Sequence, residues 1–370
     1  MVDGIVAYSE LNNPSDAIED VLKQISIKGD PVLVIFHSAP EPFKQYAERF
    51  GRAFPKAEIM GCTTGGEMSS KGNGKNALVA WTVMSGVECA SGVLLEIASY
   101  PKRYSESIEK ALHSLSGTDN TVCIDFNTYG DNCEELIQDT FRDVLEPVKV
   151  PVVGGSAGAE DHNAQTYVSL NGVVYDKAAV FLMIRNLEGK VFAYKENIFK
   201  STKKITTATD VDCEARVVYE FEFMPAAEVM SFMLNVDREH LFDVLKERPL
   251  GRITGKDIYL TDMKEIREDG SIEYFARIYN QTKVAIMEPD VPEVVWKQTA
   301  AAVKSVIMHP SITYCIQCAA RSAFLERHDK LNGFAEAFKN EYGQYAGFVG
   351  LGEQFNYEHF NDTMVMVVFE

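Results

Sequence analysis

The stretch "AEIMGCTTGGEM" (residues 57–68) carries the pattern that decides the fold. A short apolar run reaches a glycine, and a thiol, two hydroxyls, two more glycines and a glutamate follow. A glycine followed six residues later by a glutamate occurs at three matched places: Gly61 to Glu67, Gly154 to Glu160 and Gly347 to Glu353. Each lies between an amphipathic stretch and an apolar run, so the pattern predicts a β-α-loop-β unit that is used three times.

The three predicted units occupy residues 31–84, 121–184 and 313–369, and we expect them to superpose with their first glycines at equivalent strand ends. In the first unit, apolar residues recur at helical spacing after the strand "PVLVIFHSA": Phe43, Tyr46, Ala47 and Phe50. In the second unit, a helical stripe follows "TVCIDFNTYG": Leu136, Ile137, Phe141, Val144 and Leu145.

The region between the second and third units has a different character. We expect strands, a helix entered at Pro225, a second helix over 237–248, and antiparallel strands around a turn at Asp269-Gly270. A further helix over 291–308 has its predicted apolar stripe at Val294, Val295, Ala302, Val303 and Val306. The predicted fold class is α/β (α+β), with mixed β-sheets covered by helices in two domains, 1–200 and 201–370, divided in "KSTKKITTATD".

Charge and cysteine content narrow the function classes. The net charge of −18 repels nucleic acid and anionic lipid, so we expect neither as a partner. No long apolar run indicates a membrane span, and the start of the chain lacks the features of a signal peptide. Seven scattered cysteines favour reduced thiols in a cytoplasm. The Cys315 and Cys318 pair falls in a predicted strand, which disfavours a metal or redox role.

The order of several segments resembles the FIST family, which pairs a FIST N-terminal with a FIST C-terminal domain. The segments are "IMGCTTGGEM", "PVVGGSAG", "RVVYEFEFMPAAEVMSFML", "PLG" at 249–251, "EDGSIEYFARIYNQTKVAIM", "CAAR" and "GFVGLGEQF" with "NDTMVMVVF". The resemblance implies an intracellular sensory module that binds small ligands such as amino acids. Some members are similar to haem proteins that sense nitric oxide and act on a histidine kinase. Because these segments leave no room for an output domain, we expect signalling to a separate protein, such as a histidine kinase.

The glycine-rich loops are the predicted ligand site, because glycines let backbone N–H groups approach a ligand while hydroxyls add hydrogen bonds. A phosphate-binding loop is disfavoured, since no lysine follows Gly66. Glu67, Glu160 and Glu353 could hold an ammonium group, and Arg321 could meet a carboxylate or pair with one of these glutamates. The predicted ligand-binding residues are Gly61, Cys62, Thr63, Thr64, Gly65, Gly66, Glu67, Gly154, Gly155, Ser156, Ala157, Gly158, Arg321, Gly352 and Glu353.

Three other interpretations compete with ligand binding. A hydrolase would use Cys62 or Ser156 with a histidine in reach, for which His37 and His162 are candidates. A haem protein would use His162 or His240 as axial ligand, although the absence of C-x-x-C-H excludes covalent attachment. The glycines could also serve packing alone. We predict a non-enzymatic protein with no catalytic residue, no metal ligand and no required cofactor.

Overall fold

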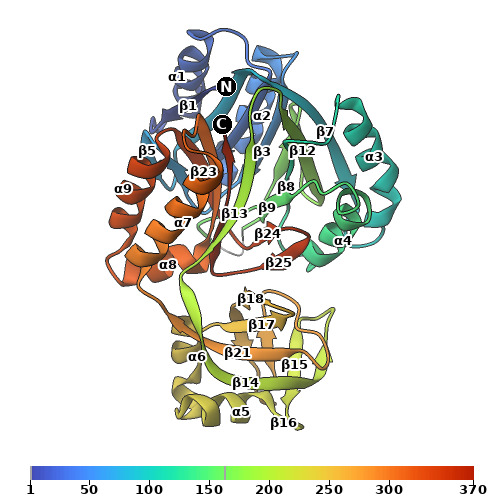
Figure 1. Cartoon of the computed structure of the whole chain (residues 1–370), viewed down its shortest axis with the longest axis vertical. Helices are drawn as coiled ribbons and strands as arrows, with labels where there is room; N and C mark the ends of the chain where they lie inside the picture. Colours follow the sequence, from blue (N-terminus) through green and yellow to red (C-terminus); the bar gives the residue numbers. More distant parts are fainter. Residues whose placement is uncertain (1, 162–163) are drawn as a thin grey trace.

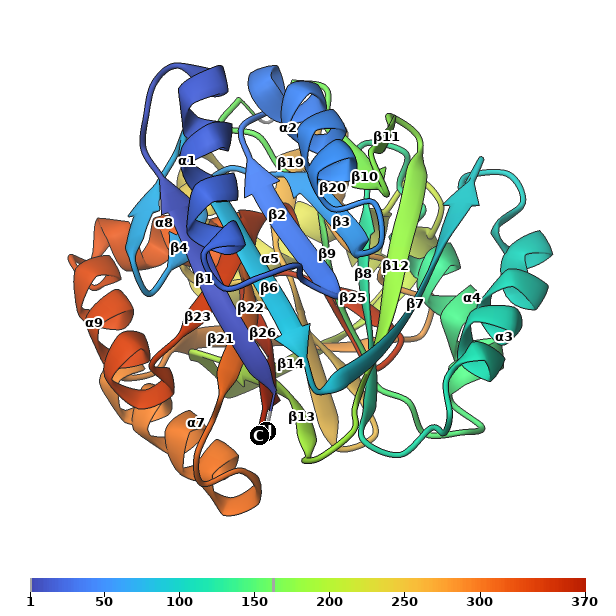
Figure 2. The same ribbon diagram turned by 90° about the horizontal axis from the view of Figure 1, so that it is seen from above.

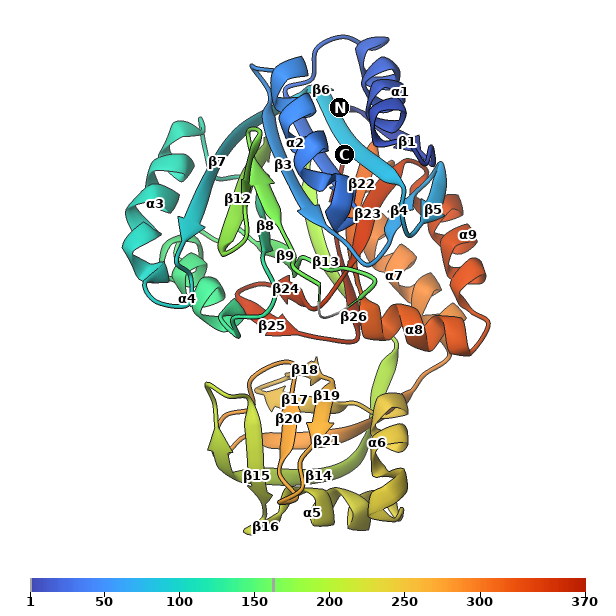
Figure 3. The ribbon, with the colours of Figure 1, turned by 180° about the vertical axis from the view of Figure 1, so that it is seen from behind.

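The computed structural model describes residues 2–161 and 164–370, whose strands form three six-stranded sheets and one eight-stranded sheet. In Figure 1 the six-stranded sheets lie together in the upper part of the molecule, and the eight-stranded sheet lies apart below them. We call these parts the body (2–198 and 290–370) and the lobe (199–289). The chain leaves the body near residue 200, where a domain boundary was predicted, and returns to it before α7 (Figure 3).

The first sheet of the body contains the "GCTTGG" strand. Its strands, in spatial order, are β1 (Asp3–Ser9), β6 (Leu78–Ser85), β2 (Leu33–Ser38), β3 (Glu58–Thr63), β10 (Val168–Leu170) and β11 (Val173–Tyr175). Two helices cover it, α1 (Pro14–Ser26) and α2 (Pro40–Ala53). Asn13 caps α1 by accepting hydrogen bonds from the backbone of Ser15 and Asp16. The four predicted apolar positions of α2 are all buried.

The second sheet has the same arrangement of corresponding strands as the first sheet. Its strands are β7 (Val87–Leu95), β12 (Ala178–Asn186), β8 (Thr121–Asn127), β9 (Val152–Ser156), β24 (Glu353–Phe355) and β25 (Glu358–Phe360). Its helical segments are the 3-10 turn η1 (Pro101–Tyr104), α3 (Ser105–Ser114) and α4 (Glu134–Leu145). In α4, Ile137, Phe141 and Leu145 are buried as predicted, whereas Leu136 and Val144 are partly buried.

The third sheet is built from residues far apart in the chain. Its strands are β13 (Val191–Asn197), β26 (Thr363–Phe369), β22 (Ile312–Cys318), β23 (Tyr345–Gly350), β4 (Glu67–Ser69) and β5 (Gly72–Gly74). Its helices are α7 (Pro292–Val306), α8 (Ala319–Arg327) and α9 (Leu331–Tyr342). The predicted stripe of α7 is wrong at Val294, which is 49% exposed. Val295 and Val303 are buried as predicted, Ala302 and Val306 are partly buried, and Thr299, which was not predicted, lies on the same helix face between Val295 and Val303.

Each sheet ends in a hairpin that belongs to another unit. The β10–β11 hairpin of the second unit joins the first sheet, β24–β25 of the third joins the second, and β4–β5 of the first joins the third. The first glycine of each unit has a parallel partner on one side and an antiparallel partner on the other. Gly61 pairs with Phe36 and Ser169, Gly154 with Asp125 and Gln354, and Gly347 with Cys315 and Met68. Superposition of whole units stays a prediction, but sheet order and register are common to all three.

The three sheets face one another around a shared core, with their helices outside (Figure 2). This arrangement covers both faces of β2, β8, β22 and β26, which explains why these strands are buried at every position and read as continuous apolar runs. Near the centre, the His37 ring lies 5.5 Å from that of Phe126 and 4.7 Å from that of Phe348. One residue from each sheet therefore contributes to this aromatic cluster.

The lobe contains the strands and helices expected between the second and third units. Its strands are β14 (Phe199–Asp212), β15 (Val217–Phe221), β16 (Met224–Pro225), β17 (Leu250–Thr254), β18 (Asp257–Thr261), β19 (Met263–Ile266), β20 (Ile272–Tyr274) and β21 (Lys283–Pro289). Its helices are α5 (Ala226–Leu234) and α6 (Arg238–Glu247). Gly270 has φ +87° in the turn between β19 and β20, a conformation that favours glycine.

A buried ion cluster fixes the lobe to the body. Arg216 of the lobe contacts Glu134 at 2.5 Å and Glu135 at 2.6 Å, both in the first turn of α4. All three side chains are more than nine-tenths buried.

Across the described residues, no helix combines the length and apolarity needed to cross a membrane.

Candidate functional site

A cavity of about 340 Å³ lies where the first glycine-rich loop meets the second and third units. Its wall comes from the β3–β4 loop and β4–β5 hairpin, the segment after β9, and β22, β23, α8 and α9. The wall residues are Gly65, Gly66, Glu67, Met68, Asn73, Gly74, Lys75, Ala159, Glu160, Gln317, Ala319, Ser322, Ala323, Glu326, Leu331, Asn332, Phe334, Ala335 and Val349. We call it the loop cavity. Its volume is within the range of small-molecule sites.

Backbone of all three units meets at Gly65. The Gly65 N–H donates to the carbonyl of Val349 at 3.0 Å. A Cβ on Gly65 would lie 3.4 Å from the Ala159 carbonyl oxygen, and one on Gly158 would lie only 2.9 Å from the Gly65 nitrogen. The φ angles of Gly65 and Gly158 are not positive. Glycine is therefore needed at these positions because other backbone atoms approach closely, and not because of backbone strain.

Glu67 closes the first loop on itself. Its carboxylate accepts hydrogen bonds from Thr64 Oγ1 at 2.6 Å and from the Ala77 N–H at 3.0 Å. Burial raises the pKa of Glu67 to about 7, although these two hydrogen bonds oppose the shift. The carboxylate that we expected to hold a ligand ammonium therefore already has internal partners, while part of the residue still lines the cavity.

Of the wall residues, only Gly65, Gly66 and Glu67 were predicted to bind ligand, and Gln317 is the most informative of those that were missed. It is fully buried on β22, and its Nε2 has no hydrogen-bond partner among the described residues. Its Oε1 accepts a hydrogen bond from Arg321. A buried amide donor without a partner is unfavourable by about 1–3 kcal/mol, unless a ligand or water accepts from it. The sequence signal was a glutamine inside a mostly apolar strand.

Arg321 does not line the loop cavity. It is fully buried, forms an ion pair with Glu196 of β13, and holds Gln317 through a hydrogen bond. Pairing with a glutamate was one of the two expected roles, but the partner is Glu196 rather than Glu67, Glu160 or Glu353. Glu160 instead pairs with Lys75 at 3.3 Å, where both side chains are exposed.

The second glycine-rich loop packs inside the body. A Cβ on Gly154 would lie 2.0 Å from Asp125 Oδ1, and one on Gly155 would lie 2.7 Å from Ile316. Ser156 is fully buried, receives a hydrogen bond from Gln354 Nε2 at 3.3 Å, and is not a wall residue. The remaining predicted site residues Gly61, Cys62, Thr63, Thr64, Ala157, Gly158, Gly352 and Glu353 are likewise outside the wall.

Glu353 is the first residue of β24, where it pairs with Gly155 in the second sheet. Its Oε2 accepts from the Thr363 hydroxyl at 2.9 Å and from the Thr363 N–H at 3.3 Å, and its Oε1 has no partner among the described residues. Burial raises its pKa to about 8. Gly352, with φ +143°, packs so tightly that a Cβ would lie 2.5 Å from the His359 ring.

The nearest arrangement to a catalytic pair is Cys62 with His37. The distance from Cys62 Sγ to His37 Nδ1 is 3.3 Å, and His37 Nε2 lies 2.7 Å from the Tyr314 hydroxyl. All three side chains are fully buried. Burial raises the pKa of the Cys62 thiol and lowers that of His37 to about 3. The pair is therefore neutral, and a neutral buried thiol is inert.

The other cysteines and histidines form no cluster for a metal ion in the described parts of the chain. All seven cysteines are free, and no group of three or more His, Cys, Asp or Glu residues there is placed to hold a metal ion. His240 is exposed on α6, whereas His162 lies outside the described residues.

The molecule is an α/β protein with a partly polar cavity of the size of small-molecule sites, and the wall of this cavity contains no thiol or imidazole. Comparison with known families agrees: the FIST N domain matches residues 32–223 and the FIST C domain matches residues 226–356. The chain belongs to the FIST family. FIST domains are sensory domains of signal-transduction proteins. No curated protein matches this chain.

Proposed function

We propose that this protein is a cytoplasmic, non-enzymatic sensor that binds a small polar ligand of amino-acid type in the loop cavity and signals to a separate protein, such as a histidine kinase. The observation that carries the proposal is the unpartnered Gln317 Nε2 in a cavity whose wall comes from three units. A ligand acceptor, such as a carboxylate oxygen, would satisfy this donor.

The rest of the wall suits the opposite end of such a ligand. Ser322, Asn73 and Asn332 offer neutral polar groups, and Glu326 offers an exposed carboxylate for an ammonium group. Lys75 is already paired with Glu160. The free cysteines support the cytoplasmic assignment, because unpaired thiols persist in a reducing compartment.

A substitution that replaces the amide donor with a carboxylate acceptor tests the ligand's orientation. Gln317→Glu keeps an oxygen to accept from Arg321 but replaces the free amide donor with a carboxylate oxygen. Thermal shift against the common amino acids identifies a ligand, since a concentration of about 100 times Kd adds roughly 2.7 kcal/mol of stability. Calorimetry then compares wild type, Gln317→Glu and the matched control Gln298→Glu, which adds the same charge to an exposed position on α7.

We expect at least a tenfold loss of affinity in Gln317→Glu, about 1.4 kcal/mol, and none in Gln298→Glu. The proposal is wrong if no amino acid stabilises the protein, or if Gln317→Glu binds the ligand as tightly as the wild type does.

A further inference from the structure

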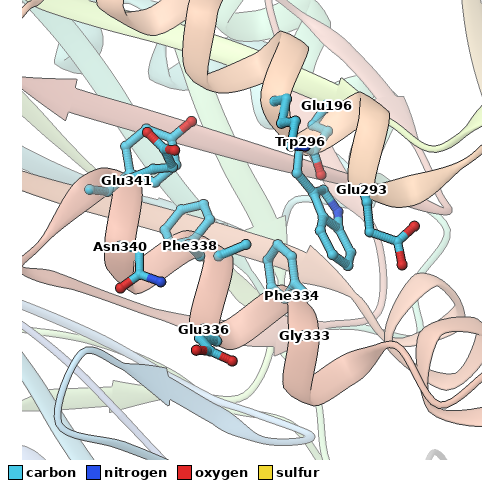
Figure 4. A pocket seen from close by; sticks show the side chains of 12 residues that line it. Glu196, Glu293, Trp296, Gly333, Phe334, Glu336, Phe338, Asn340 and Glu341 are labelled. Atoms are coloured by element: carbon cyan, nitrogen blue, oxygen red, sulfur yellow. The ribbon is translucent and has the colours of Figure 1, made fainter.

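A second cavity, of about 410 Å³, lies between α7 and α9 on the outer side of the third sheet. Figure 4 shows Trp296 from α7 beside Phe334 and Phe338 from α9, with glutamates around them. Tyr342 completes the aromatic part of the wall. We call it the aromatic cavity. It is separate from the loop cavity, although Phe334 contributes to both walls.

Two hydrogen-bond donors in this wall are unsatisfied. The Nε1 of Trp296 and the hydroxyl of Tyr342 are buried and have no partner among the described residues. Tyr342 as a whole is only 5% exposed. Packing alone explains Phe334, Phe338 and Tyr342, which recur every four residues on α9, but it does not explain two donors left without acceptors. An occupant should therefore supply acceptor atoms.

The charges of the wall favour a neutral ligand. Glu196, Glu293, Glu336 and Glu341 line the cavity together with Lys297, so negative and positive groups are both present. Three of these glutamates already pair with cations: Glu196 with Arg321, Glu293 with Lys330, and Glu341 with Lys304. The net field is consequently weak, and a simple ammonium ion, which has no acceptor for Trp296, fits poorly.

We propose that the aromatic cavity binds a neutral, amino-substituted heteroaromatic ring of about the size of a purine. The ring stacks against Trp296 and Phe338, as aromatic side chains prefer. Ring nitrogens accept from Trp296 and Tyr342, and the exocyclic amino group donates to a wall carboxylate.

Fluorescence of 2-aminopurine provides the test, because stacking on aromatic side chains quenches its emission. We expect quenching by the wild-type protein and reversal by adenine. Unsubstituted purine lacks the amino group, and adenosine monophosphate adds a phosphate, so both should compete at least tenfold more weakly than adenine. Choline tests for a simple cation and should not compete.

Variants assign the binding to this cavity. Trp296→Leu removes the stacking surface, and Tyr342→Phe removes only the unpartnered hydroxyl, so each should weaken 2-aminopurine binding about fivefold or more. Tyr342→Phe should not lower the thermal stability of the free protein, because that hydroxyl makes no internal hydrogen bond to lose. Val294→Ala, an exposed position on the same helix, is the matched control and should bind as the wild type does.

The proposal is overturned if 2-aminopurine is not quenched at about 1 mM protein and ligand, a concentration that detects even millimolar affinity. It is also overturned if choline or adenosine monophosphate competes as well as adenine, or if Trp296→Leu and Tyr342→Phe both bind normally. The aromatic cavity is assayed with 2-aminopurine and the loop cavity with amino acids, so failure of one site is distinguishable from failure of the other.

Discussion

Replacing Glu353 with glutamine should change how stability depends on pH. The folded pKa of Glu353 is about 8, because the side chain is fully buried, whereas an unfolded glutamate titrates near 4.3. The folded protein therefore holds a proton that the unfolded chain releases. A raised pKa gives a stabilisation that is complete below about pH 4.3 and is lost as pH rises to about 8.

The size of this effect follows from the linkage relation. Each pH unit between the two pKa values removes about 1.4 kcal/mol, so about 4 kcal/mol is lost between pH 5 and pH 8. Glutamine stays neutral and matches the observed contacts, because its carbonyl can accept both bonds from Thr363 while its amide replaces the unpartnered Oε1. Arg321, Cys318 and Asp362 also act on the charge of Glu353, so 4 kcal/mol is an upper value.

Urea unfolding at pH 5, 6, 7 and 8 measures the difference in unfolding free energy between Glu353→Gln and the wild type. We expect the variant to gain on the wild type steadily as pH rises. Glu109→Gln, at an exposed position on α3, should show no such trend. A difference that stays constant across this pH range, or that moves against the variant, would refute the protonated, buried Glu353.

Three further predictions concern packing, charge and thiols. Gly158→Ala should destabilise the protein by about 1–3 kcal/mol and Gly65→Ala by much less, because only the Gly158 Cβ would lie within 3.0 Å of backbone; urea unfolding that ranks them in the reverse order contradicts this. Arg216→Met should lower the unfolding free energy by about 3–5 kcal/mol at pH 7, since it leaves Glu134 without its cation and Glu135 with only Arg277 at 3.6 Å, whereas the exposed Lys283→Met should change it by under about 0.5 kcal/mol; similar losses in both would argue against the ion cluster. Titration of the denatured, unreduced protein should find about seven thiols, and a count near five would indicate a disulfide.

The strands and helices were predictable from the sequence, but the hairpin exchange was not. Apolar runs such as "PVLVIFHSA" and the stripe of α2 report local burial, and the structure agrees with them. The strands β4, β10 and β24 have three residues each, and nothing local to "EMS" specifies that it pairs with β23. Their partners are chosen by long-range packing, which a periodicity analysis does not contain.

The candidate site was predictable only in part for the same reason. The glycine motif drew attention to Gly65 and Gly66, which line the loop cavity, because close backbone approach requires glycine and is therefore visible in the sequence. The role of Arg321 depends on Glu196, which lies 125 residues away, and that of Gln317 depends on which of its atoms lacks a partner. Conversely, Gly154 and Gly155 share the motif but serve packing, since their missing side chains make room for Asp125 and Ile316.

If the loop cavity binds a ligand as proposed, α8 is the element that connects this cavity to the lobe. Ser322, Ala323 and Glu326 place one side of α8 in the cavity wall. At its C-terminal end, Arg327 and His328 each contact Glu247 of α6 in the lobe at 2.8 Å. Arg321, in the same helix, pairs with Glu196 on β13, the strand that leads directly into β14 of the lobe. A packed helix moves as a unit, so a ligand that draws α8 toward Gln317 acts on both connections to the lobe at once.

The exposed Glu247 contacts are weak and can exchange, whereas the buried Arg216 cluster resists separation. Ligand binding should therefore turn the lobe about the Arg216 cluster rather than release it, and hydrogen exchange should change at α6 and α8 but not at Arg216.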